Sequence, residues 1–222
     1  MIKFQAIFFD FDGVLAESMN VKTEAFITIF SKYGDDVVKL VVDHHIENGG
    51  ISRYEKIQYY YKEYLGKEIS EEDLNKTADF FSTLVVDKVI HSAWVKGAKR
   101  FLETHYKKID LYIVTGTPQS EIDLIVKKRN MEKYFKGICG SPEKKDQIMN
   151  RLILKNDYDP NNVIFFGDAM SDYYASIKSK VYFIGISKNN TSIFPKKTVI
   201  FPDFEKIDIK KISKVKDEIS NI

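Results

Sequence analysis

Two aspartates lie two positions apart at the end of a hydrophobic run. Residues 6–15 read AIFFDFDGVL, so Asp10 and Asp12 follow four apolar residues. In a strand, side chains at i and i+2 point the same way, and two carboxylates at short range repel each other and are costly to desolvate. Such a pair needs compensation, and a bound cation is the first candidate.

Further polar residues follow other apolar runs of the chain. They are Thr115 and Gly116 after DLYIV, Asp168 and Asp172 at the end of and just after NVIFFGD, and Lys144 and Lys145 after GSPE. In an open parallel sheet, ligands bind beyond the carboxyl ends of the strands. We therefore expect four carboxylates, a hydroxyl and at least one ammonium to meet at one sheet edge.

That collection of groups fits phosphoryl transfer. Asp10, Asp168 and a backbone carbonyl can hold Mg²⁺, which prefers oxygen ligands and offsets carboxylate repulsion. One carboxylate can act as nucleophile and form an aspartyl-phosphate. A second carboxylate two residues away can protonate the leaving oxygen and then activate water. A hydroxyl, a backbone N–H and a lysine can stabilise charge on the transferring oxygens.

The elements that must position these residues follow from hydrophobic periodicity. A strand is expected over 4–12, and helical spacing dominates from about 16 to 91, interrupted by the irregular stretch DHHIENGG. Beyond residue 91, helices and strands alternate. The helices are expected at 97–107, 118–130, 143–156 and 170–179, and the strands at 110–115, 135–140, 162–168, 181–187 and 198–201, with an amphipathic tail carrying Ile212, Val215, Ile219 and Ile222.

Alternating strands and helices predict a parallel sheet, and the helical segment interrupts this alternation just after the first strand. The predicted fold is therefore α/β, with a Rossmann-like parallel sheet core formed by residues 1–15 and 92–222. Residues 16–91 are expected to form an inserted all-helical cap domain. His44 and His45 either face the active site from this cap or, in the interpretation we favour, lie exposed in a loop.

Composition narrows the function classes. The chain has 222 residues and a net charge of only +2, so no global field recruits nucleic acid or a membrane. Cys139 is the only cysteine, which rules out an intrachain disulfide and fits a cytoplasmic location. No apolar run approaches the length of a membrane span. Nothing in the sequence indicates an oligomeric state.

Four segments together carry a family resemblance. DFDGV (10–14), VTGT around Thr115, GSPEKK, and GDAMSD (167–172) resemble the four ordered motifs of the haloacid dehalogenase-like (HAD) hydrolase superfamily. The position of the helical segment resembles the subgroup that includes phosphoglycolate phosphatases and β-phosphoglucomutases. The resemblance implies a Mg²⁺-dependent enzyme, and the acid at position 12 implies a phosphoryl substrate, because dehalogenases lack an acid there.

The resemblance also implies individual functions. Asp10 corresponds to the nucleophile and metal ligand, and Asp12 to the general acid/base that lends the metal its backbone carbonyl. Asp168 corresponds to the acidic metal ligand, and Asp172 to a second acid that contacts the metal directly or through water.

Thr115 corresponds to the phosphate-binding hydroxyl, with Gly116 beside it. The pattern GSPxxK selects Lys145 as the active-site lysine, and Lys144 is its close competitor.

The cap adds one short similarity. Gly50-Ile51-Ser52-Arg53 resembles a stretch in β-phosphoglucomutase caps whose Arg grips a distal phosphate, which makes Arg53 a candidate substrate-binding residue. The chain departs from those mutases nearby, since Glu47 or Asn48 stands where a lysine is usual. We therefore expect a phosphatase acting on a small phosphorylated metabolite. A phosphomutase and a catalytically silent binding protein are the alternatives.

Overall fold

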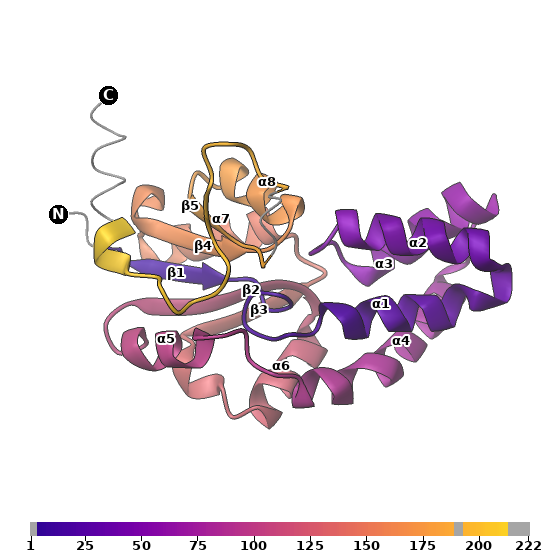
Figure 1. Cartoon of the computed structure of the whole chain (residues 1–222), viewed down its shortest axis with the longest axis horizontal. Helices are drawn as coiled ribbons and strands as arrows, with labels where there is room; N and C mark the ends of the chain where they lie inside the picture. Colours follow the sequence, from indigo (N-terminus) through magenta and orange to yellow (C-terminus); the bar gives the residue numbers. More distant parts are fainter. Residues whose placement is uncertain (1–3, 189–192, 213–222) are drawn as a thin grey trace.

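The computed structural model describes residues 4–188 and 193–212, and shows one parallel sheet with a group of helices beyond one edge (Figure 1). The sheet has six strands in the order β3-β2-β1-β4-β5-β6, and every neighbouring pair is parallel. The strands are β1 (Ala6–Phe9), β2 (Asp110–Pro118), β3 (Gly137–Ser141), β4 (Val163–Gly167), β5 (Tyr182–Ile186) and β6 (Val199–Phe201). This confirms the predicted α/β class.

Strand β1 lies at the centre of the sheet and is buried on both faces. Ile7 and Phe9 belong to one hydrophobic cluster, whereas Ala6 and Phe8 belong to another on the opposite face. Helices cover both faces, with α5 and α6 on one side and α7 and α8 on the other (Figure 1). Their bounds are α5 (Ala98–His105), α6 (Gln119–Lys128), α7 (Lys145–Asn156) and α8 (Met170–Lys178), and three 3₁₀ turns cover Ser31–Tyr33, Glu132–Tyr134 and Pro160–Asn162. A central strand covered on both faces holds whatever follows Phe9 in a fixed position.

A helical insertion separates β1 from β2, as the sequence predicts. It comprises α1 (Met19–Phe30), α2 (Asp35–Glu47), α3 (Arg53–Tyr59), which continues as a π-helical segment (Tyr60–Tyr64), and α4 (Glu71–His91). Phe26, Phe30, Tyr60 and Phe81 are fully or almost fully buried and form its interior. In Figure 1 the arrow of β1 points toward these helices, so the insertion faces the carboxyl edge of the sheet.

Two chain segments connect this insertion, the cap, to the core side by side. Glu17 donates its N–H to the carbonyl of Ala93 at 2.9 Å, and Val95 donates to that of Leu15 at 3.1 Å. Arg129 of the core donates to three backbone carbonyls within residues 89–92 at 2.8–3.0 Å. The two segments that connect the core and the cap therefore lie close to the proposed cap boundaries at 16 and 91.

Three local predictions were wrong. Residues 43–47 belong to α2 rather than to an irregular stretch, because the helix begins after Gly34 with the favourable acids Asp35 and Asp36 and runs to Glu47. Pro118 ends β2 and precedes α6 instead of being its first residue. The first strand ends at Phe9, before the turn that carries the two aspartates.

The tail prediction concerns residues that are mostly not described, since Val215, Ile219 and Ile222 lie in 213–222. Across 4–188 and 193–212, none of the helices combines the length and the apolar character that crossing a membrane demands.

Candidate active site

Asp10 and the turn after it form the floor of the site. The N–H of Asp10 donates to the carbonyl of Phe166 at 2.9 Å, which fixes the end of β1 against β4. Gly13 has φ +79°, and a Cβ there would lie 2.0 Å from Oδ2 of Asp168. Only glycine fits both the backbone conformation and the space, so this turn can pass directly against the second acidic segment.

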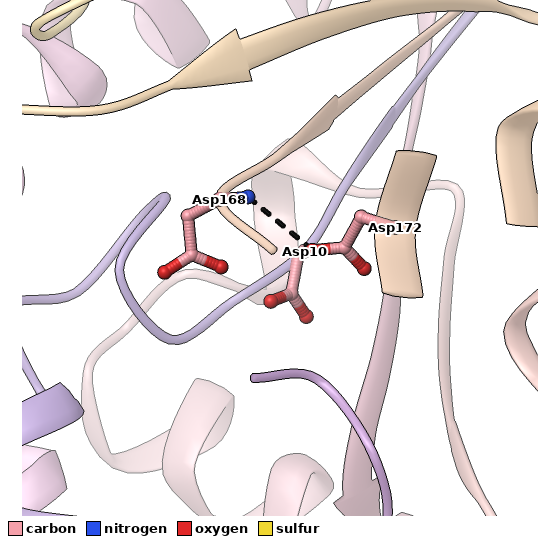
Figure 2. Close-up of side chains that lie close together, drawn as sticks. All are labelled: Asp10, Asp168 and Asp172. Atoms are coloured by element: carbon pink, nitrogen blue, oxygen red, sulfur yellow. Dashed lines mark hydrogen bonds between the residues drawn. The ribbon is translucent and has the colours of Figure 1, made fainter. Parts of the chain in front are cut away.

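Asp168 and Asp172 come from the end of β4 and the first turn of α8, and both approach Asp10 (Figure 2). Oδ2 of Asp172 accepts the N–H groups of Asp168 at 3.3 Å and Ala169 at 3.2 Å. Its Oδ1 accepts from Nζ of Lys145 at 2.6 Å. Both oxygens of Asp172 therefore have partners within the protein, so this side chain orients the loop and the lysine.

Asp10, Asp168 and Asp172 each place an oxygen within 4.8 Å of the others. Among the described residues, Oδ1 of Asp168 is buried without a hydrogen-bond partner, and the buried Oδ1 of Asp10 has an ion pair with Lys145 at 3.0 Å. Burial and the neighbouring carboxylates of Asp10 and Asp172 raise the pKa of Asp168 well above its usual range. An unpartnered oxygen in a cluster of negative charge fits a hard divalent cation, so these residues could hold a metal ion.

Lys145 is the lysine that reaches the site, at the start of α7. Its Nζ lies 3.0 Å from Oδ1 of Asp10 in addition to its bond with Asp172, and the side chain is 7% exposed. Burial would lower its pKa, but the two carboxylates outweigh burial and raise it, so the side chain is a firm cation. Lys144 is exposed, and no ion pair joins it to Asp10 or Asp172 among the described residues. The structure thus brings Lys145, and not Lys144, to Asp10.

The carboxylate of Asp12 points to partners of its own. Oδ1 accepts from the Ser18 hydroxyl at 2.6 Å, and Oδ2 accepts from Thr117 at 3.1 Å and from the ammonium of Lys22. Burial would raise the pKa of Asp12, but the charge of Lys22 and these hydrogen bonds together lower it. Lys22 belongs to α1, so a cap residue compensates the second aspartate.

Thr115 and Gly116 lie where the sequence places them, at the carboxyl part of β2. Thr115 is buried, and its hydroxyl accepts the N–H of Thr117 at 3.2 Å. A Cβ at Gly116 would lie 2.5 Å from the carbonyl oxygen of Gly50, so the cap loop rests on this glycine. The cap is therefore in contact with the phosphate-binding segment predicted from the sequence.

Arg53 is buried at the start of α3, but its guanidinium is already engaged by an acid of the core. Nη1 and Nη2 donate to the two oxygens of Glu121 at 2.8 and 2.5 Å, and Nη1 also donates to Ser82 at 2.7 Å. The guanidinium carbon lies 4.5 Å from the centre of the Phe81 ring. This geometry makes Arg53 a bridge between cap and core.

Two further cap residues, His45 and Lys56, line the site. Neither was among the site residues predicted from the sequence. His45 is 3% exposed, although it was expected in an exposed loop, and Lys56 is 2% exposed. His45 is buried because it follows Val41 by four residues on the inner face of α2. Nζ of Lys56 lies 2.8 Å from Nδ1 of His45. His44 is only partly buried and stacks on Tyr59.

A small cavity of about 40 Å³ joins the core and cap groups. It is lined by residues from both sides, among them Asp10, Asp12, Lys22, His45, Lys56 and Thr115. This space holds only a few water molecules. A metabolite-sized ligand would therefore need the cap to move away from the sheet before it could enter.

The sheet, the helical insertion after β1 and the acidic cluster define an α/β protein with a helical cap over a candidate metal site. The sequence profile of the haloacid dehalogenase-like hydrolase family matches residues 7–186, and the chain belongs to this family. No curated protein sequence matches the chain.

Solved structures agree on the fold. The chain is similar to a β-phosphoglucomutase from Clostridium difficile, with 18% identity, a TM-score of 0.79 and coverage of 99% of this chain and 100% of that one. It is also similar to a predicted phosphoglycolate phosphatase from Haemophilus somnus 129PT, with 21% identity, a TM-score of 0.73 and coverage of 96% and 99%. The HAD hydrolase YfnB from Bacillus subtilis, whose structure has bound magnesium, matches with 13% identity, a TM-score of 0.67 and coverage of 97% and 99%.

Proposed function

We propose that this protein is a Mg²⁺-dependent phosphatase that hydrolyses a small phosphorylated metabolite through an aspartyl-phosphate on Asp10. The observation that carries the proposal is the state of the Asp10 carboxylate. Its Oδ1 is buried and lies 3.0 Å from the ammonium of Lys145, and a second carboxylate with separate partners lies two residues away. A buried carboxylate held beside a cation is suited to attack phosphorus.

Two steps follow from this arrangement. First, a carboxylate oxygen of Asp10 forms a bond to phosphorus while the bond to the substrate's leaving oxygen breaks, and Asp12 in its acid form gives that oxygen a proton. Second, Asp12 takes a proton from water as the water oxygen bonds to phosphorus and the aspartyl ester bond breaks. The lowered pKa of Asp12 favours the carboxylate required for this second step and disfavours the acid form required for the first.

Lys145 and Thr115 would stabilise negative charge on the phosphoryl oxygens. Lys145 is held in place by Asp172, and Thr115 is buried at the end of β2. Gly116, next to Thr115, would offer its backbone N–H to the same oxygens. These groups are positioned before substrate arrives, so little reorganisation is needed during the reaction.

Asp10 and Asp168 would hold Mg²⁺, together with the backbone carbonyl of Asp12, and Asp172 would act through its hydrogen bonds to the loop. When bound, the ion supplies positive charge that attracts the phosphate and offsets repulsion between the carboxylates. The magnesium found in the YfnB structure supports this choice of metal.

A phosphomutase is the second candidate, and the similarity to a β-phosphoglucomutase favours it. In that reaction the phosphoryl group returns to a second substrate hydroxyl instead of water. We prefer the phosphatase because Arg53, the residue on which the mutase assignment depends, is neutralised by Glu121 in the closed arrangement. A catalytically silent binding protein is less favoured, because all the groups needed for turnover are present.

The test is a phosphate-release assay over a panel of phosphorylated metabolites, with Mg²⁺ and with the Asp10→Asn variant as control. We expect wild-type protein to release free phosphate and the variant to lose turnover while keeping its melting temperature. Isomer formation without free phosphate would establish the mutase. Phosphate release by Asp10→Asn at the wild-type rate would refute the nucleophile.

A further inference from the structure

The cap wall of the site carries a cation for which the described residues provide no acid. Lys56 is 2% exposed, and no carboxylate among residues 4–188 and 193–212 forms an ion pair with its Nζ. The neighbouring cations are all paired, Lys22 with Asp12, Arg53 with Glu121 and Lys145 with Asp10 and Asp172. A buried charge without a counterion is costly, and a ligand that brings the opposite charge removes this cost.

His45 adds a second donor beside Lys56. When Lys56 is an ammonium it has only donor hydrogens, and Nδ1 of His45 then accepts at 2.8 Å. The ring proton is then on Nε2, which is buried and has no hydrogen-bond partner within the described part of the chain. Lys56 also donates to the His45 carbonyl at 3.3 Å. The third N–H of its ammonium is then left without an acceptor among the described residues. Two donors therefore remain unused in the cap.

Electrostatics support the same conclusion. Burial, followed by the charges of Lys22 and Lys145, lowers the pKa of Lys56 to about 7. Burial and the Lys56 charge lower the pKa of His45 to about 3, so the imidazole is neutral. Lys56 is thus a buried cation whose ammonium form Asp168 and Asp12 only partly support, and a negative group from outside the protein would stabilise it.

Both side chains line the cavity that also contains Asp10 and Thr115. We propose that Lys56 and His45 form a subsite for a second anionic group of the substrate, so that the enzyme acts on phosphate monoesters whose other end bears a carboxylate or a second phosphate. This inference rests on the proposed function and specifies its substrate class. It reassigns to Lys56 the selectivity that the sequence pattern suggested for Arg53.

The test compares substrates that differ in one group. 3-Phosphoglycerate carries a carboxylate where glycerol 3-phosphate carries a hydroxymethyl group. We expect wild-type protein with Mg²⁺ to prefer 3-phosphoglycerate in kcat/KM, and the Lys56→Met variant to lose about tenfold of that preference ratio, as for a lost hydrogen bond to a charged group. His45→Phe should lower the ratio in the same direction. Lys62→Met, on the exposed face of the π-helical segment, is the matched control and should leave the ratio unchanged.

A binding measurement separates this inference from the proposed function. The melting temperatures of wild-type protein and Lys56→Met are recorded with each of the two compounds and with 1,3-propanediol bisphosphate. 3-Phosphoglycerate and 1,3-propanediol bisphosphate carry a second anionic group. A larger shift with these two compounds in wild-type protein than in Lys56→Met supports the subsite. If that difference appears but no phosphate is released, only the phosphatase proposal fails. Equal shifts in the two proteins would overturn the subsite. So would an equal loss of kcat/KM for 3-phosphoglycerate and glycerol 3-phosphate in Lys56→Met.

Discussion

The contact between Arg53 and Glu121 gives a quantitative prediction about how the cap is held closed. The side chains are 5% and 14% exposed and form two parallel N–H···O bonds. Ser82 also donates to Glu121 at 2.5 Å. Arg53 and Ser82 belong to the cap and Glu121 to α6 of the core, so this cluster joins the two parts of the molecule.

The protein can respond in two ways when one partner of this ion pair is removed. If the cap stayed closed, the Glu121→Ala variant would leave a buried guanidinium unpaired, at a cost of about 3–5 kcal/mol. Cap opening would instead hydrate Arg53 and lose only the hydrogen bonds, about 1.5–3 kcal/mol. Because opening costs less, we expect the variant to open its cap and to lose about 1.5–3 kcal/mol of stability relative to the closed wild-type protein. The closed state itself should lose about 3–5 kcal/mol relative to the open one, more than a hundredfold change in the equilibrium.

A double-mutant cycle measures this coupling. Glu121→Ala, Arg53→Ala and the double variant are unfolded with urea, and small-angle X-ray scattering reports the radius of gyration of each native state. We expect an interaction energy of about 1.5–3 kcal/mol and a larger radius for each variant. Glu132→Ala, at an exposed position of the core, is the control. A coupling below about 0.5 kcal/mol with unchanged radii would refute the idea that this pair closes the cap.

Three further predictions concern the site itself. Asp12→Ala should lower kcat by about 10²–10⁴, the usual contribution of an acid–base group, and an unchanged rate of phosphate release would exclude that function. Mg²⁺ at 100 times its dissociation constant should stabilise the wild-type protein by about 2.7 kcal/mol, seen as a higher melting temperature that EDTA reverses; Asp168→Asn should lose this response, and an equal response would place the metal elsewhere. Because the pKa of Lys56 is lowered to about 7, the ammonium is present below that pH, so the kcat/KM preference for 3-phosphoglycerate should decline as pH rises from 6 to 8. The profile should be flat in Lys56→Met, and a parallel decline there would assign the titration to another group.

The core half of the site could be predicted because it depends on local sequence. Asp10 and Asp168 directly follow buried strands, and parallel strands bring their carboxyl ends to one edge. Asp172 is placed by the first turn of α8, four residues after Asp168. The pattern GSPxxK favours Lys145 over Lys144, and the packing of α7 places Lys145 at Asp10, because adjacent positions differ by about a third of a helical turn.

The cap half could not be predicted in the same way. Lys22 and Glu121 gain their partners only when the cap packs against the core, Lys22 with Asp12 and Glu121 with Arg53. Nothing in either segment alone indicates these contacts. His45 was assigned to a loop because the polar residues and glycines of DHHIENGG around it are typical of loops. One signal was available, since Lys56 lies beside Ile57 and three residues after Arg53, on the apolar face of a predicted helix. A charge on a buried helix face indicates a specific partner or ligand.

The charges around the cavity explain which ligand the site can accept. On the core side, Asp10, Asp168 and Asp172 lie together beside Lys145, and Oδ1 of Asp168 has no hydrogen-bond partner among the described residues. This is an excess of negative charge that a metal ion would satisfy. On the cap side, Lys56 is the positive group that lacks an acid. A phosphate monoester brought to a metal at the sheet edge would place its other end toward the cap, where a neutral group would leave Lys56 unsatisfied and an anionic one would not. Under the proposed function, cap closure would expel water and favour this class of substrate, because the hydrogen bonds to Lys56 and His45 would strengthen as water leaves the cavity.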